Sequence, residues 1–135
     1  MAACTPISVN SKGFNPRTRL PYGLKIEHIE KAMNEFVDFL GFINVQLKTR
    51  KVTRFESMLM PANFSSMVGE FMSAGIPKYC PTLVKNGYHN GHPDLVPKGR
   101  YPGDCIQHDC DGIEIKGSHY AKGWQGHNPE DCWLM

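Results

Sequence analysis

Two stretches decide how this 135-residue chain is interpreted: Gly112-Ile113-Glu114-Ile115-Lys116 and, upstream of it, His92-Pro93-Asp94. Side chains alternate between the two faces of a β-strand. The first stretch therefore predicts a strand with Glu114 and Lys116 on one face and two isoleucines on the other, buried face. A second strand that starts at Asp94 would place another carboxylate beside them. Two carboxylates and an ammonium group suit a hard cation next to a phosphate.

The first half of the chain predicts helices. From Lys25 to about Leu40 the apolar residues follow helical spacing, and Gly41 is expected to end that helix. Periodicity leaves residues 42–47 open as a short strand or a continued helix. A second helix is expected from Asn63, as its N-cap, to about Ala74, with Gly75 and Pro77 ending it.

The second half predicts short strands near residues 82–84, 94–96, 112–116 and 132–135. We therefore expect one α/β domain with a mixed sheet flanked by helices: an irregular arm (1–24), a helical part (25–75) and a strand-rich part (76–135). The last five residues read as the first half of a buried strand. Either the protein continues beyond them or this strand pairs with a neighbouring subunit.

Composition narrows the setting of the protein. No apolar run approaches the length of a membrane span, and the first ten residues lack signal-peptide character, so a cytoplasmic protein is expected. Five cysteines at irregular spacing argue against a disulfide framework. Residues 1–54 hold nine Lys and Arg against four Asp and Glu, and residues 55–135 hold six against nine. A basic front half suits phosphates, although a chance imbalance on a solvated surface explains it equally well.

The residues Pro93, Asp94, Glu114 and Lys116 resemble the motif of the PD-(D/E)xK nuclease superfamily, which includes type II restriction endonucleases. The resemblance covers roughly residues 63–135 and implies a restriction-endonuclease-like fold. It implies Mg²⁺, replaceable by Mn²⁺, held by Asp94, Glu114 and the backbone carbonyl of Ile115, with Lys116 orienting the attacking water. Many members add a helical glutamate ahead of the first motif strand, which is Glu70 here.

The function that this resemblance implies is hydrolysis of double-stranded DNA by a type II restriction enzyme. A divalent ion between two carboxylates polarises the phosphate and lowers the pKa of its bound water, and the ammonium group stabilises the developing charge. A homodimer is expected because two strands need two sites. The segment 117–128, which follows the motif, is interpreted as a DNA-facing loop or as an ordinary surface loop.

A non-catalytic nucleic-acid-binding module is the alternative. Zinc bound by Cys105, His108 and Cys110, with Cys80, His89 and His92 not far upstream, would give a zinc-stabilised form, although the spacing is irregular. A degenerate nuclease fold that binds without cutting would be the other form. Both alternatives stay open at this point, as does the plain interpretation of the acidic and basic residues as a turn and a solvated cross-strand pair.

Overall fold

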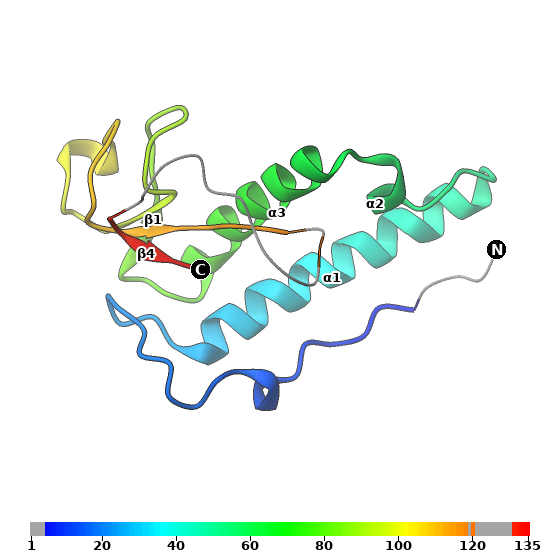
Figure 1. Cartoon of the computed structure of the whole chain (residues 1–135), viewed down its shortest axis with the longest axis horizontal. Helices are drawn as coiled ribbons and strands as arrows, with labels where there is room; N and C mark the ends of the chain where they lie inside the picture. The colour runs from blue at the N-terminus through cyan, green and yellow to red at the C-terminus, as the bar shows by residue number, and fades with distance from the viewer. Residues whose placement is uncertain (1–4, 119, 121–130) are drawn as a thin grey trace.

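The computed structural model describes residues 5–118, 120 and 131–135, which form a mixed α/β fold (Figure 1). The α-helices are α1 (Ile26–Thr49), α2 (Phe55–Met58) and α3 (Pro61–Gly75). Short 3₁₀ turns occur at Ser11–Gly13, Ile76–Lys78 and Pro102–Asp104. The strands are β1 (Leu83–Lys85), β2 (Leu95–Pro97), β3 (Ile113–Glu114) and β4 (Trp133–Leu134).

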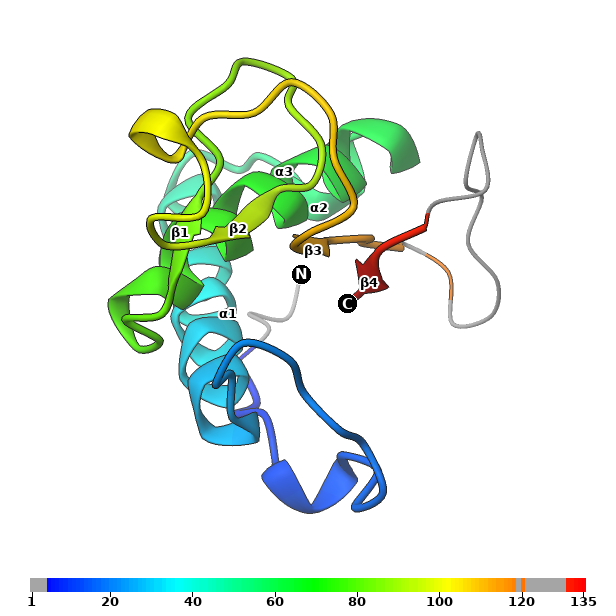
Figure 2. The same ribbon diagram turned by 90° about the vertical axis from the view of Figure 1, so that its left-hand side faces the viewer.

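The four strands form one mixed sheet in the order β1-β2-β3-β4, which Figure 2 shows side by side. The pairs β1–β2 and β2–β3 are antiparallel, and β4 runs parallel to β3. The expected α/β class with a mixed sheet is therefore confirmed at this level. The strands lie within a few residues of the predicted stretches, and each is shorter than the run of β-forming residues around it.

The core lies where the helices meet the sheet. Helix α1 runs along the molecule with the N-terminal arm on one side and α3 on the other (Figure 1). The apolar faces of the two helices pack together and onto the buried faces of the strands. The core comprises Leu24, Ile29, Ala32, Met72, Ile76, Cys80, Leu83, Leu95, Ile113 and Ile115.

The prediction that Gly41 ends the first helix is wrong. Helix α1 continues through Gly41 to Thr49, so residues 42–47 are helical and the strand alternative also fails. Gly41 is buried in the helix interior because the arm crosses there: a Cβ at this position would collide with the ring of Pro6. Close approach of another chain segment, rather than termination, is the reason for this glycine.

The start of the second helix also differs from the prediction. Helix α3 begins at Pro61 with Met60 as its N-cap, three residues before the expected N-cap Asn63. Proline suits the first helical position because its fixed φ matches the helix and its missing N–H would have no partner there. The short helix α2 was not expected. Among the residues that the structure describes, no helix is long and apolar enough to cross a membrane.

Candidate functional site

The pairing of β2 with β3 brings the two predicted carboxylates to one place. Leu95 lies opposite Ile113 in this antiparallel pair, so one step further Asp94 faces Glu114. Residues directly opposite each other place their side chains on the same face of the sheet. The carboxylate of Asp94 also reaches the next residue of the facing strand: Oδ2 accepts a hydrogen bond of 2.8 Å from the N–H of Ile115.

The carboxylate of Glu114 lies between two cationic or potentially cationic groups. Oε1 accepts a hydrogen bond of 2.8 Å from Nζ of Lys116, and Oε2 lies 3.0 Å from Nδ1 of His92. The Glu114 side chain is only 13% exposed. The contact with His92 is close but lacks hydrogen-bond geometry, and Oε2 accepts no hydrogen bond within the described part of the chain. A buried carboxylate oxygen is thus left with capacity for a ligand.

Burial makes the charge on Asp94 costly. Removal from water raises the pKa of its carboxyl group from 3.8 to about 6, and the nearby Glu114 charge adds to the rise. The hydrogen bond from Ile115 and the ammonium of Lys116 act in the opposite direction. A carboxylate whose charge is disfavoured by burial and by a second carboxylate nearby forms an arrangement that a cation stabilises.

The backbone of Ile115 is directed to the same side as Asp94. The residues on either side of Ile115, Glu114 and Lys116, direct their backbone groups toward the last segment of the chain. The N–H of Met135 donates to the carbonyl of Glu114, and the N–H of Lys116 donates to the carbonyl of Met135. The N–H and C=O of one strand residue point to the same neighbour. Because the N–H of Ile115 donates to Asp94, its carbonyl is directed to the same edge, where the resemblance expects a metal ligand.

A buried asparagine holds the segment that carries Asp94. Nδ2 of Asn86 donates to the carbonyls of Pro93 and Ile106, and Oδ1 accepts from the N–H groups of Tyr88 and Ile106. Asn86 is 7% exposed. One side chain thus joins three loop segments and fixes the residue immediately before Asp94.

Glu70 lies further from this group than the resemblance predicts for a ligand. It projects from α3 with 73% of its side chain exposed, and its carboxylate pairs with Nζ of Lys85 at 2.6 Å. Its charge is near enough to contribute to the raised pKa of Asp94. Of the four predicted site residues, the fold brings together Asp94, Glu114 and Lys116 and leaves Glu70 at the periphery.

His92 lies beside Glu114, although the sequence did not predict it as part of the group around Asp94 and Glu114. Besides its contact with Glu114, its ring stacks on His108 with centroids 5.0 Å apart, and Nε2 lies 3.6 Å from Sγ of Cys132. The available signal was its position two residues before Asp94.

The donor set at Asp94 and Glu114 fits a hard divalent ion. Mg²⁺ usually takes one or two carboxylates from the protein, with the remaining positions filled by water and phosphate oxygens. The buried Oε2 of Glu114, which accepts no hydrogen bond in the described part of the chain, agrees with this demand. So does the carbonyl of Ile115, which strand geometry directs to the same side as its N–H. In residues 5–118, 120 and 131–135, no three His, Cys, Asp or Glu side chains are arranged around one ion. Cys105, His108 and Cys110 are among these residues, and the zinc alternative stays a prediction from the sequence.

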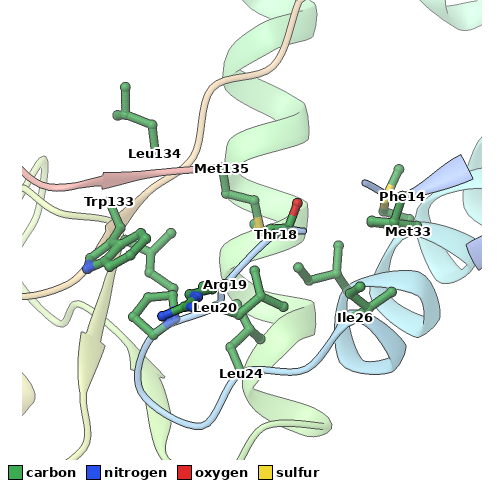
Figure 3. A pocket seen from close by; sticks show the side chains of 13 residues that line it. Phe14, Thr18, Arg19, Leu20, Leu24, Ile26, Met33, Trp133, Leu134 and Met135 are labelled. Carbon is green, nitrogen blue, oxygen red and sulfur yellow. The ribbon is translucent and has the colours of Figure 1, made fainter. Parts of the chain in front are cut away.

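An apolar pocket of about 360 Å³ lies elsewhere, between the arm, the start of α1 and β4. In Figure 3, Trp133 and Met135 extend from β4 toward the arm residues. Ile113 lines this pocket, so β3 separates it from Glu114, whose side chain points to the opposite face. Arg19 is its one charged lining residue among those described.

Comparison of the chain with protein-family models, with curated proteins and with solved structures found no match in any of the three. The resemblance at Pro93, Asp94, Glu114 and Lys116 therefore stays a prediction from the residues. Most of the segment 117–128, expected to face DNA, lies outside the described residues.

Proposed function

We propose that this protein is a divalent-metal-dependent DNA endonuclease, most simply a homodimeric type II restriction enzyme. The observation that supports it best is the convergence of Asp94, Glu114 and Lys116 at the β2–β3 pair, with Oε1 of Glu114 2.8 Å from Nζ of Lys116. The motif needs these three groups together, although Glu114 and Lys116 lie far from Asp94 in sequence. A mixed sheet with helices packed on it is also what the resemblance implies.

Each side chain has a distinct task in the proposed reaction. Asp94, Glu114 and the carbonyl of Ile115 would hold Mg²⁺, which when bound polarises the phosphate and lowers the pKa of a coordinated water. Lys116, held by Glu114, presents its ammonium group to the charge that builds on the phosphate oxygens. The hydrogen bond from Ile115 orients Asp94 so that its second oxygen remains available.

The proposed substrate is double-stranded DNA, which suits the cationic end of α1. Lys48, Arg50 and Lys51 are exposed there. Cations on an exposed turn neutralise phosphates without reading base sequence. A homodimer would present two sites to the two strands, and its symmetry would match a palindromic target.

Incubation of supercoiled plasmid with the purified protein and Mg²⁺ or Mn²⁺ tests the proposal. We expect discrete linear fragments, abolished by EDTA and by Asp94→Ala. Glu27 is an exposed glutamate on α1 and not part of the site, so Glu27→Ala is the matched control and should keep cutting. A folded protein that binds DNA but leaves the plasmid intact with both ions would contradict the catalytic proposal and favour a degenerate, non-cutting module.

A further inference from the structure

We propose that the middle of α1 is the contact surface between two copies of this chain, with the two α1 helices packed antiparallel about a two-fold axis between Phe42 and Val45. The inference rests on the proposed function, which asks for a homodimer, and names the surface that forms it. Its starting point is an apolar patch of Ile7, Phe42 and Val45, whose side chains are 86%, 63% and 51% exposed.

The apolar patch joins two segments of the chain that touch. Phe42 and Val45 are three residues apart in α1, so they lie on one face of the helix. The N-terminal arm crosses α1 at Gly41, where a Cβ atom would collide with the ring of Pro6, and Ile7 directly follows this crossing. Figure 1 shows the arm running alongside α1. The patch is therefore a continuous surface rather than three scattered side chains.

The opposite face of α1 is covered by the rest of the fold. Phe36 packs edge-on against the rings of Phe64 and Phe71 of α3. Further along the helix, Oδ1 of Asn44 accepts a hydrogen bond from the N–H of Phe55 in α2. The apolar patch thus lies on the side of α1 that the fold leaves open to solvent. Large apolar side chains gathered on an exposed face are typical of a contact with another protein.

The charges of α1 indicate which protein makes this contact. Residues 30–38 hold three acidic residues against one lysine, whereas residues 39–51 hold three basic residues and no acidic one. Antiparallel packing of two such helices lays the acidic half of each copy on the basic end of the other, and it also opposes their helix dipoles. Parallel packing would set like charges together. A second copy of this chain in antiparallel orientation therefore complements the surface.

The two-fold axis determines which charged residues meet. Asp38 precedes the centre between Phe42 and Val45 by about as many residues as Lys48 follows it. Antiparallel helices therefore bring Asp38 of one copy within reach of the lysine side chain at position 48 of the other. Both side chains are exposed in the single chain. The symmetry repeats this pair, so two ion pairs would flank an apolar centre.

Sedimentation velocity of the metal-free protein over a range of concentrations tests the inference. The native protein should form a dimer that dissociates on dilution. Asp38→Lys and Lys48→Glu each place two like-charged pairs in the interface, so each variant alone should dimerise at least about tenfold more weakly. An equal mixture of these two variants should form a heterodimer with near-native affinity, because every reversed charge then faces an opposite charge.

Two further variants test the apolar centre and the specificity of the charge effect. Phe42→Lys places a cation at the centre of the patch and should give a monomer. Lys98→Glu reverses an exposed charge in the strand-rich half, away from α1, and should dimerise like the native protein. Circular dichroism of each variant checks that it is folded.

The outcomes separate this inference from the proposed function. A native protein that stays monomeric at every concentration overturns the inference and the homodimer. A dimer that Asp38→Lys and Phe42→Lys leave unchanged overturns the α1 surface and leaves a homodimer through another surface. Weakened variants that fail to combine in the mixture overturn the antiparallel pairing. Rescue by the mixture in a protein that does not cut DNA supports the interface and contradicts the nuclease.

Discussion

The side chain of Asp94 takes the place of a backbone partner for Ile115. Oδ2 accepts the N–H of Ile115 at 2.8 Å, where the β2–β3 ladder has ended at the pair Leu95 and Ile113. One oxygen of a half-buried carboxylate is thereby used to extend the sheet. The same carboxylate lies close enough to Glu114 for the charge of Glu114 to raise its pKa, which links the local architecture of the strands to the proposed chemistry.

The raised pKa of Asp94 predicts a pH-dependent cost to stability. The folded protein keeps the Asp94 proton up to about pH 6, whereas the unfolded chain releases it near pH 3.8. The contribution of Asp94 to the free energy of unfolding should therefore fall as the pH rises from about 4 to 6 and then level off. Asp94→Asn removes this dependence. The free energy of unfolding of the metal-free Asp94→Asn variant, minus that of the native protein, should therefore be larger at pH 7.5 than at pH 4 by about 1–2 kcal/mol after allowance for screening by water.

Urea unfolding of native protein and Asp94→Asn in EDTA, at pH 4 and pH 7.5, measures this difference. Asp109→Asn is the control, because the pKa of Asp109 is lowered, chiefly by the backbone hydrogen bond from Cys110. That substitution should shift stability in the opposite direction or not at all. The prediction would be contradicted if the free energy of unfolding of the native protein rose with pH relative to that of Asp94→Asn.

Lys116→Ala should separate metal binding from turnover. The ammonium group contacts Glu114 but is not a metal ligand, so Mn²⁺ binding should persist while DNA cleavage falls by about 100-fold or more. Cleavage rates and Mn²⁺ titrations on the same preparation check it. Lys85→Ala is a matched control, since Lys85 pairs with the exposed Glu70 and not with Glu114. Loss of metal binding in Lys116→Ala would show that the lysine positions the ligands instead.

Glu70→Gln tests the one predicted site residue that lies at the periphery. Its carboxylate is exposed and already paired with Lys85, so we expect a loss in cleavage of less than about tenfold, against a loss of about 100-fold or more for Glu114→Gln. Single-turnover cleavage of a plasmid at saturating Mg²⁺ compares the two. Equal losses would mean that Glu70 reaches the ion when DNA is bound.

Asn86→Ala should both destabilise the fold and weaken the site. It removes the partners of two N–H groups and two carbonyls around the residue that precedes Asp94, at a cost of about 2–4 kcal/mol. Mn²⁺ affinity of the remaining folded protein should fall as well. Asn44→Ala breaks comparable bonds to Phe55 and Glu56 between α1 and α2, so it should reduce stability and leave Mn²⁺ affinity unchanged.

Local patterns in the sequence predicted some features of the structure correctly and others wrongly. Alternation placed Glu114 and Lys116 on one face because strand geometry depends only on neighbouring residues. The end of α1 could not be predicted from Gly41, because the reason for that glycine is contact with Pro6, thirty-five positions earlier. The start of α3 was misplaced because a favoured N-cap, Asn63, competed with the preference of Pro61 for the first turn.

The sequence by itself determined the residue types of the candidate site and the faces they occupy, since these follow from short-range backbone geometry. Only the tertiary structure decided which side chains meet. The antiparallel register of β2 and β3 set Asp94 opposite Glu114. Glu70 projects from α3 into solvent, at the periphery of these residues. The loop around Asn86 brought His92 to 3.0 Å from Glu114. These contacts depend on how distant segments pack, which no local pattern contains.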